Sequence, residues 1–421
     1  MCKWIFCCFY GKHKKVDKKR DKKGIKLDKK VNKQIEKPLK QLTKDKTLSP
    51  KAQEIESFYS SKEDTEDKKK KKAPTNAWER ESVTPSEIED TDMFRTYDLP
   101  FKSFHTIDAL MTHLGYELST QVGQGAYGIV RKSYHYERLG RKKVLACKEI
   151  PIKKTENKDK EIRNLKREIF VLRKCKHPYI VALVDHFAVN AKSKTIAFLF
   201  MEFADGNNLS VEIYSGTMTQ NNAKRYLIQL SIGITYLHKL KIAHKDLKPE
   251  NVLLIRNEKT GRLDIRVADF GLSQSAFKKK EGVIKTGHYG GTRAYMAPEI
   301  VSLEVYKEYK KVLSNTLEYN PFKSDMWALG IILYEMFSRQ IPFDFHNWDN
   351  MLQLQLKQEF SYPTNVRQTL VDFEKIDDLT HKLLQPDVDK RLDPFGLLIH
   401  PWLRDEVDFK LIDVTETHRQ S

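Results

Sequence analysis

The side chains best suited to chemistry gather in the stretch His244–Asn251 and in the short segment Asp269-Phe-Gly that follows it. Between them, residues 252–254 are apolar and residues 263–267 alternate in hydrophobicity, with a turn-rich piece in between, so we expect a β-hairpin. Paired strands lie about 4.7–4.9 Å apart, so the open end of this hairpin would bring Asn251 and Asp269 together. An amide oxygen beside a carboxylate suits a hard divalent cation such as Mg²⁺.

Two further charged residues stand just ahead of the same hairpin end. Asp246 could accept or orient a proton, and Lys248 could neutralise negative charge on a phosphate. The alternative is that these are turn residues that cap strand ends, and for any single one of them this is the better interpretation. Their occurrence together, in this order, favours a site for phosphate chemistry.

A glycine-rich turn lies upstream, where residues 116–151 alternate as strands do. It runs Gly123-Gln-Gly125-Ala-Tyr-Gly128-Ile-Val130, and glycine allows backbone N–H groups to approach a phosphate closely. Taken alone the pattern is weak, and a plain hairpin turn is the alternative. Because it joins strand to strand rather than strand to helix, it disfavours a dinucleotide site of the Rossmann type.

A lysine, Lys148, ends the half-buried strand run Val-Leu-Ala-Cys-Lys. A solvated edge lysine is the common case, but Glu168 stands in the next segment, 157–174, whose apolar residues are spaced as on one face of a helix. Buried charges are rarely unpaired. We therefore expect an ion pair between Lys148 and Glu168 that directs the ammonium toward phosphate oxygens.

The order of the remaining elements indicates the fold class. Strand-like runs follow at 179–187 and 195–203, and an amphipathic helix is expected at 219–238. Residues 326–337 are apolar nearly all round, which is typical of a helix buried in a core. Strands first and helices afterwards predict an α+β protein with two lobes.

The chain has 421 residues and a formal net charge of +18, and the basic excess is concentrated at one end. Residues 1–51 carry 18 basic and 5 acidic side chains, whereas residues 52–115 carry 9 and 14. Five cysteines are too few for a disulfide-stapled secreted protein. No strongly apolar stretch approaches the roughly 20 residues that span a bilayer, and the first residues lack the pattern of a signal peptide.

We expect residues 1–51 to form a basic disordered tail, and residues 52–115 a mostly disordered acidic or mixed linker whose apolar end, 93–114, could pack on the following domain. Three cysteines stand among aromatic residues ahead of the lysines: Cys2, Cys7 and Cys8. One hypothesis is an acylated anchor at a membrane surface, which needs a lipid chain plus a basic patch. The alternatives are incidental cysteines in a plain tail, or unspecific attraction to nucleic-acid phosphates. The clustered cysteines and aromatics favour the membrane, so we expect no specific nucleic-acid partner.

Taken together, the motifs resemble those of the eukaryotic protein kinases over residues 116–403. The match comprises, in order, the glycine-rich loop, the strand lysine, the helix glutamate, the two segments described first, and then Ala297-Pro298-Glu299, Asp325 and Arg391. The run Lys248-Pro-Glu-Asn251 and Thr292 resemble the serine/threonine branch. The hinge and the run 384–391 resemble the calmodulin-dependent-kinase-like group, with the testis-specific serine kinases nearest.

The resemblance implies a two-lobed protein-kinase-like fold, with a small β-rich N-lobe at about 116–204, a larger helical C-lobe at about 205–403 and a C-terminal tail at 404–421. It implies an enzyme that transfers the γ-phosphoryl group of ATP, with Mg²⁺, to serine and threonine hydroxyls of protein substrates. The alternatives are a pseudokinase scaffold, or membrane or RNA binding through the basic tail. A cytoplasmic location is expected, either free or at the cytoplasmic face of a membrane.

The resemblance also implies a role for each matched residue. Asp246 would accept or orient the substrate proton, and Lys248 would neutralise the moving phosphoryl group. Asn251 and Asp269 would hold Mg²⁺. The residues implied to bind the nucleotide are Val122, Gly123, Gly125, Gly128, Val130, Ala146, Lys148, Glu168, Met201, Glu202 and Ala204. The residues implied to be structural are the column of Leu172, Leu183, His244 and Phe270 and the buried ion pair of Glu299 with Arg391.

Departures from the family pattern carry expectations of their own. Lys245 stands where most regulated relatives have an arginine, which grips a phosphate with two hydrogen bonds as lysine cannot. His288 stands where many relatives carry an activating threonine. Both residues indicate an activity that does not depend on phosphorylation in the loop 272–296. The spacing before Asp325 is long, and we expect residues 306–321 to form an inserted surface loop.

Overall fold

The structure of the chain is a computed structural model that describes residues 95–100, 104–125, 128–137, 140–152, 158–191, 194–275, 290–310 and 319–408. All of these residues belong to one compact unit. The predictions for the basic tail with its three cysteines, for His288, and for the residues after 408 fall outside this set.

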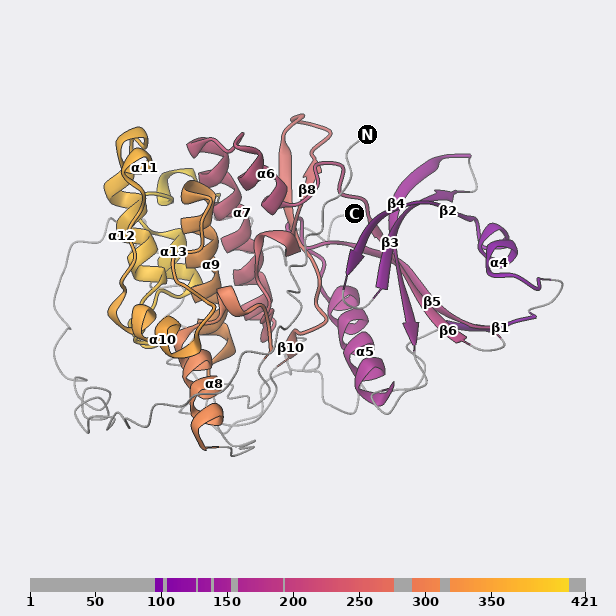
Figure 1. Ribbon diagram of the computed structural model, residues 1–421. Coiled ribbons are helices and arrows are strands. Elements are labelled where there is room, and N and C mark those ends of the chain that lie inside the picture. Colours follow the sequence, from indigo (N-terminus) through magenta and orange to yellow (C-terminus); the bar gives the residue numbers. More distant parts are fainter. Residues whose placement is uncertain are drawn as a thin grey trace, which may run out of the picture. The chain divides into compact units, whose positions relative to one another are not determined.

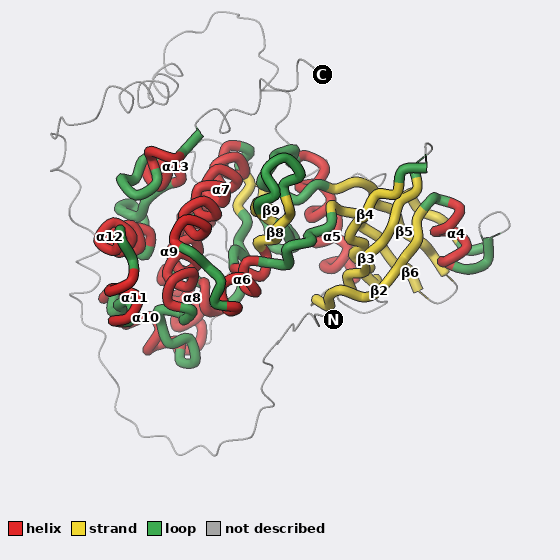
Figure 2. The backbone as a smooth tube through the Cα atoms, turned by 90° about the horizontal axis from the view of Figure 1, so that it is seen from above, coloured by secondary structure: helices red, strands yellow, loops and turns green. Residues whose placement is uncertain are grey.

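A six-stranded sheet forms the first part of the fold, with the strand order β1-β5-β6-β4-β3-β2 (Figure 1). Its strands are β1 (Arg95–Asp98), β2 (Tyr116–Gly125), β3 (Gly128–Tyr136), β4 (Lys142–Ile152), β5 (Leu183–Ala191) and β6 (Lys194–Glu202). The pairs β2–β3, β3–β4, β4–β6 and β6–β5 are antiparallel, and β1 pairs parallel with β5. Two helices, α4 (Ile107–His113) and α5 (Lys158–Lys174), lie on opposite sides of this sheet (Figures 1 and 2).

The strand predicted at 179–187 begins later than expected, because β5 starts at Leu183. Ile180 forms an isolated bridge with Val267, and the N–H of Val181 donates to the carbonyl of the same residue at 2.9 Å. These residues are thus a buried extended connection to the second part of the fold. Such a connection and a strand share the same apolar pattern, so the sequence does not separate them.

The folded residues start before position 116, with β1 and α4. The hydroxyl oxygen of Thr106 caps α4 by accepting a hydrogen bond from the backbone of its first turn at 3.2 Å. Leu110 and Met111 of this helix are 0% and 1% exposed. The described part of the apolar lead-in therefore packs on the sheet.

The second part of the fold is mainly helical (Figure 2). Its helices are α6 (Leu209–Ser215), α7 (Gln220–Lys239), α8 (Pro298–Lys310), α9 (Pro321–Ser338), α10 (Trp348–Lys357), α11 (Thr364–Thr369), α12 (Phe373–Leu383) and α13 (Pro394–Leu398). Short strands form two ribbons, β7 (Ile242–Ala243) with β10 (Gln274–Ser275) and β8 (Val252–Arg256) with β9 (Leu263–Val267). The α+β class and the two predicted helices are confirmed.

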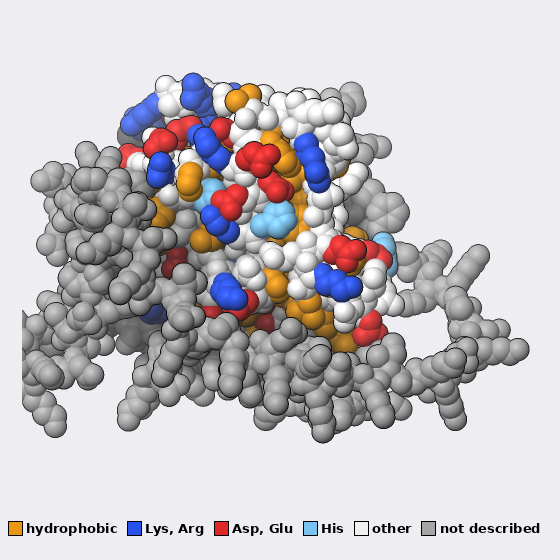
Figure 3. All heavy atoms as spheres, turned by 90° about the vertical axis from the view of Figure 1, so that its left-hand side faces the viewer, with side chains coloured by type: hydrophobic (Ala, Val, Ile, Leu, Met, Phe, Trp, Pro, Cys, Tyr) orange, Lys and Arg blue, Asp and Glu red, His pale blue; other side chains and the backbone are white. Residues whose placement is uncertain are grey.

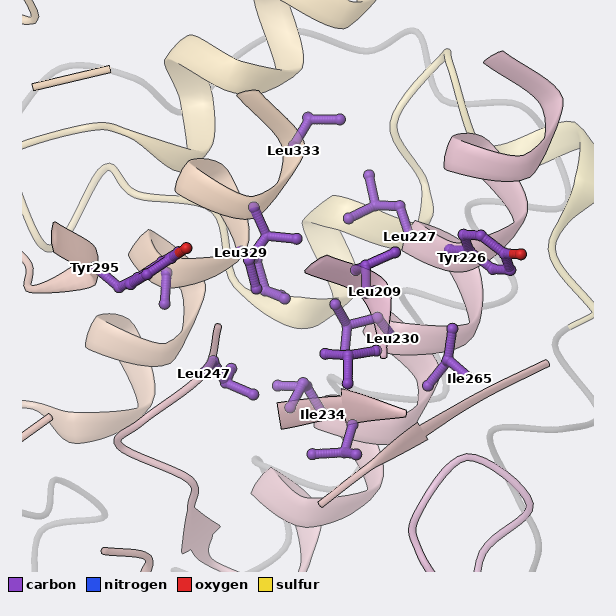
Figure 4. Packing of buried hydrophobic residues seen from close by; sticks show 14 of the residues in the cluster. Leu209, Tyr226, Leu227, Leu230, Ile234, Leu247, Ile265, Tyr295, Leu329 and Leu333 are labelled. Carbon is purple, nitrogen blue, oxygen red and sulfur yellow. The ribbon is translucent and has the colours of Figure 1, made fainter. Parts of the chain in front are cut away.

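Helices α7 and α9 form the centre of this second part. The side chains of Thr219 and Asn320 cap their first turns at 3.1 Å and 3.0 Å, and Pro321 occupies the first turn of α9, where its missing N–H costs nothing. A fully buried leucine contributes about 1.5–3 kcal/mol by leaving water. The side chains that pack between the two helices include Leu227, Leu230 and Ile234 from α7 and Leu329 and Leu333 from α9 (Figure 4).

The sequence predicts a surface loop over residues 306–321, but both ends of this range have another structure. Helix α8 continues to Lys310, Tyr319 is only 5% exposed, and Pro321 already begins α9. The prediction is wrong at these two ends, and the residues between them, 311–318, lie outside the described set. An asparagine cap followed by proline is a helix-start signal that could have marked the second end.

Figure 3 shows the face that lies at the left of Figure 1, where α11 and α12 are found. Lysine and arginine side chains alternate there with aspartate and glutamate, and the hydrophobic patches are small. Where the described residues are visible on this face, their basic side chains are interspersed with acidic ones. No helix in the described ranges is both long enough and apolar enough to cross a membrane.

Candidate active site

Strands β8 and β9 form the predicted hairpin, with Val252 opposite Val267 at its open end. The ladder continues by one further bond, in which the N–H of Ala268 donates to the carbonyl of Asn251 at 2.9 Å. Asn251 and Asp269 therefore flank the same end of the hairpin. Asp269 has φ 63°, a backbone conformation that non-glycine residues rarely adopt and that is frequent at functional sites.

The carboxylate of Asp246 is fixed by several donors. Its Oδ1 accepts from the backbone N–H of Thr292 at 2.8 Å and from the hydroxyl of the same residue at 2.9 Å. Asn251 Nδ2 donates to the Asp246 carbonyl at 2.8 Å and to Oδ2 at 3.3 Å. Lys248 Nζ lies 3.3 Å from Asp246 Oδ2 and donates to Thr292 Oγ1 at 2.7 Å. These four side chains form one hydrogen-bonded group, which we call the Asp246 cluster.

A close approach between two segments makes the Asp246 cluster possible. Gly291 has φ 121°, and a Cβ atom at this position would lie 2.7 Å from the carbonyl oxygen of Lys245. Any other residue would push the neighbouring Thr292 away from Asp246. The sequence analysis does not select Gly291. Its position directly before Thr292 could have drawn attention to it.

Lys148 forms the predicted ion pair. Its Nζ lies 2.6 Å from Glu168 Oε1 on α5 and 3.4 Å from Asp269 Oδ1. Burial disfavours the charged form, but the two carboxylates outweigh this effect and raise the pKa of the Lys148 ammonium above its usual value. The same ammonium lowers the pKa of Asp269. The lysine therefore links the sheet, α5 and the hairpin end through one charge.

The glycine-rich turn joins β2 to β3 as predicted, with Gly123 opposite Val130 and Gly125 opposite Gly128. At Gly128 a Cβ atom would lie 2.0 Å from the carbonyl oxygen of Glu149 on β4. Close packing inside the sheet therefore requires this glycine, independently of any phosphate. The sequence pattern alone attributes it to phosphate binding and does not reveal this second reason.

The side chains expected around an adenine lie on neighbouring strands. Ala146 on β4 stands opposite Met201 on β6, and Val130 on β3 stands opposite Lys148. Val122 lies on β2, where the pairing with β3 shifts register. The expected hinge residues Glu202 and Ala204 follow at the end of β6. The structure thus brings this set together along one strip of the sheet.

Glu202 has further contacts that the sequence does not reveal. Its N–H donates to the carbonyl of Ala182 at 3.1 Å, and its Oε1 accepts from the N–H of the same residue at 2.8 Å. Its carboxylate also lies 3.2 Å from Arg266 Nε on β9. The hinge strand is therefore tied to the hairpin of the second part of the fold.

A buried acid, Asp325, holds the backbone just before Asp246. It is 1% exposed and accepts from the N–H of His244 at 2.8 Å, the N–H of Lys245 at 2.8 Å and a ring nitrogen of His238 at 2.9 Å. Lys245 is thereby kept at φ 71°, in the left-handed region. The sequence analysis matches Asp325 to a family motif but does not predict these hydrogen bonds. Its signal is a carboxylate directly before the apolar run 326–334 of α9.

One contact of the implied column and the implied buried ion pair are present. The rings of His244 and Phe270 lie 5.1 Å apart between centroids, and a ring nitrogen of His244 bonds the carbonyl of Ala268 at 3.0 Å. Arg391 and Glu299 form a two-pronged pair at 2.8 Å and 2.9 Å, with the arginine fully buried.

Residues 116–403 match the family described as "Protein kinase domain". The chain belongs to the protein kinase domain family. CBL-interacting protein kinase 26 of Oryza sativa subsp. japonica is 33% identical over 294 residues, which are 70% of this chain and 53% of the relative. CBL-interacting serine/threonine-protein kinase 5 of Arabidopsis thaliana is 30% identical over 290 residues, with 69% and 58% covered. Serine/threonine-protein kinase ATG1b of Arabidopsis thaliana is 30% identical over 296 residues, with 70% and 37% covered.

The chain thus spans about half the length of the curated relatives it matches. The predicted membership of the eukaryotic serine/threonine protein kinases is confirmed. The finer resemblance to the testis-specific serine kinases stays a prediction.

Within the kinase domain, Lys245 lies in an unusual electrostatic environment. Burial and the nearby Arg167 of α5 lower the pKa of its ammonium to about 8, against the opposing effect of Asp325. The ammonium lies 6.0 Å from the ring centroid of Tyr319. Two cations thus face each other beside the segment that carries Asp246.

Proposed function

We propose that this chain is an active serine/threonine protein kinase that transfers the γ-phosphoryl group of ATP to hydroxyls of protein substrates. The Asp246 cluster carries the proposal, because it places a carboxylate and an ammonium within 3.3 Å of each other at the hairpin end. A general base and a nearby positive charge at one point are what transfer of a phosphoryl group to a hydroxyl requires. A pseudokinase scaffold, the alternative, would need neither.

Asp246 would orient the substrate hydroxyl and accept its proton at Oδ2. Its Oδ1 accepts two hydrogen bonds from Thr292 at 2.8 Å and 2.9 Å, whereas the donors at Oδ2 lie at 3.3 Å, so Oδ2 is the oxygen more open to a substrate. Lys248 lies beside that oxygen and would neutralise charge on the phosphoryl group as it moves. The fixed orientation of both side chains reduces the reorganisation needed in the reaction.

ATP and Mg²⁺ are standard cofactors of the family, and the residues present fit them. Asn251 Nδ2 is engaged with Asp246, so its Oδ1 remains as an acceptor for a cation. Lys148 lowers the pKa of Asp269, so this carboxylate is ionised at neutral pH. Bound Mg²⁺ would supply positive charge to the phosphate oxygens, and Asn251 and Asp269 would hold it. Lys148, held by Glu168, would bind the α/β-phosphates.

The test is transfer of labelled phosphate from ATP to peptide libraries by the purified full chain with Mg²⁺. We expect label on serine and threonine, little on tyrosine, and none after chelation of the metal. A chain that Mg·ATP stabilises against heat but that phosphorylates no library would support the scaffold and contradict the proposed activity.

We also propose that residues 1–51 attach the kinase to the cytoplasmic face of a membrane, with residues 52–94 as the linker to the folded part. Cysteines among aromatics, followed by many lysines, offer both signals that stable anchoring requires. Each lysine near an anionic leaflet adds about 1 kcal/mol. Serine and threonine residues of proteins at that surface would then be the accessible substrates.

A further inference from the structure

The β1–α4 segment, residues 95–100 and 104–115, completes a hydrophobic cluster on one side of the sheet. Helix α4 lies on the side opposite to α5 (Figures 1 and 2). The cluster brings together Leu110 and Met111 from α4, Leu145 and Cys147 from β4, and Phe198 and Phe200 from β6, all of them at most 1% exposed.

The cluster that α4 joins includes residues of β4 and β6, two strands that also carry proposed nucleotide ligands. Successive side chains of a strand point to opposite faces. Cys147 faces the α4 cluster, whereas the next residue, Lys148, reaches Glu168 on the other side at 2.6 Å. Phe200 belongs to the same cluster, and the next residue is Met201. The layer directly behind the nucleotide-facing side chains is therefore the one that α4 completes.

Polar contacts hold the β1–α4 segment in place as part of the sheet. Arg95 forms an ion pair with Asp185, whose other oxygen accepts from the hydroxyl of Tyr116 at 2.8 Å. Asn190 Nδ2 donates to Asp98 Oδ1 at 2.7 Å. These bonds reach both ends of β1, so this strand is fixed to β5 over its whole paired length.

We propose that the β1–α4 segment is a positioning element of the nucleotide site, with Leu110 and Met111 as its positioning residues. They act through β4 and β6, because close-packed neighbours transmit a volume change as a shift of the strand. Truncating Leu110 leaves a cavity that its neighbours fill only in part, and this collapse moves the backbone that carries Lys148. The inference rests on the proposed ATP-dependent activity.

The test compares Leu110→Ala with Leu397→Ala in the full chain. Both leucines are 0% exposed, but Leu397 lies on α13, in the helical part of the fold. Rates are measured at a temperature where circular dichroism shows both variants folded. We expect Leu110→Ala to raise KM for ATP at least fivefold and KM for the peptide less than twofold. Leu397→Ala should lower the melting temperature and leave KM for ATP within twofold of the parent.

Three further variants keep the inference falsifiable if Leu110→Ala does not fold. Thr106→Ala removes only the cap of α4 and should raise KM for ATP about twofold or more. Met111→Leu conserves volume and should keep KM for ATP at the parent value, whereas Met111→Ala should raise it. Equal KM values for ATP in Leu110→Ala, Thr106→Ala, Met111→Ala and Leu397→Ala would overturn the inference.

Nucleotide binding is read separately from catalysis through the rise in melting temperature that Mg·ATP produces. An inactive parent that Mg·ATP still stabilises would contradict the proposed function, while a smaller rise in Leu110→Ala than in Leu397→Ala would still support the inference. A parent that Mg·ATP does not stabilise would contradict both.

Discussion

The ammonium of Lys148 lies 2.6 Å from the carboxylate of Glu168 and 3.4 Å from that of Asp269. The three residues come from β4, from α5 and from the end of the β8–β9 hairpin, which are far apart in the sequence. One buried cation thus joins the sheet, the helix and the hairpin that carries the proposed metal ligands. Removing it should disturb all three.

Lys148→Met should lower kcat/KM for ATP by at least about 100-fold, because loss of one preorganised charge at a phosphoryl-transfer site has effects of this order. The substitution also leaves Glu168 and Asp269 without their shared partner, so α5 loses its tie to the hairpin. Initial rates at varied ATP concentration measure the effect.

Lys142→Met is the matched control for this variant. Lys142 lies on the same strand, but it is exposed and its ammonium lies 3.7 Å from the ring centroid of Tyr134. Its loss should leave the dependence on ATP unchanged. If the two variants showed the same ATP dependence, Lys148 would not be the phosphate ligand.

Asp246→Asn should lower kcat by about 10²–10⁴-fold while the fold survives, since general-base and orienting contributions have this size. The amide oxygen can keep both hydrogen bonds from Thr292. The amide nitrogen would then face the donors Asn251 Nδ2 and Lys248 Nζ and could not accept a proton. Rate measurements together with thermal unfolding separate the loss of function from a loss of structure.

The control for Asp246→Asn is Asp205→Asn, at an exposed carboxylate paired with Arg256 at 3.6 Å. Exposed pairs contribute little, so this variant should keep the parent rate. A parent-like rate in Asp246→Asn would show that the carboxylate is not the base.

The hairpin site was predictable because its signals are local. Asn251 and Asp269 stand at the ends of two short strands joined by a recognisable turn, and the pairing rule brings them together. The parallel pairing of Arg95 with Phe187 had no such signal, because its partners are distant in sequence and β1 has four residues. Gly291 was missed for a related reason, since only the approach of two separate segments makes a side chain there impossible.

Lys245 should make stability depend on pH in the alkaline range. The pKa of its ammonium is about 8 in the folded chain and about 10.4 when unfolded, so between these values the unfolded chain binds more protons. The free energy of unfolding should therefore rise with pH across this window. Below pH 8 Lys245 is charged in the folded chain as well, so the full cost of burying its charge lowers the stability there. Lys245→Met removes that cost. It should stabilise the chain more at pH 7 than at pH 9.5.

Urea unfolding of the parent and of Lys245→Met at these two pH values measures the difference. The groups that face Lys245 include Arg167, Asp325 and Tyr319. A stabilisation of the same size at both pH values would mean that Lys245 does not titrate in this window.

Activity should not require phosphorylation in the loop 272–296. His288 stands where many relatives carry an activating threonine, and the backbone N–H of Thr292 donates to Asp246 at 2.8 Å. Phosphatase treatment and Thr286→Ala should each leave the rate within about tenfold of the parent, or 1.4 kcal/mol in the barrier. A larger loss in either case would instead indicate that Lys245 and Arg167 bind a phosphate on this loop.

Replacing Cys2, Cys7 and Cys8 by serine should release the protein from membranes in cells. One acyl chain contributes about 0.8 kcal/mol per buried CH₂, whereas lysines alone are weakened by screening at physiological salt. Neutralising five lysines of the tail, Lys12, Lys14, Lys15, Lys18 and Lys19, should release it in part. Neither change should alter phosphorylation of a soluble peptide, because the tail lies outside the residues that match the kinase family. Fractionation at physiological salt decides the matter: a soluble parent would exclude the anchor, and a membrane-bound triple variant would place the attachment in the basic segment or in a partner protein.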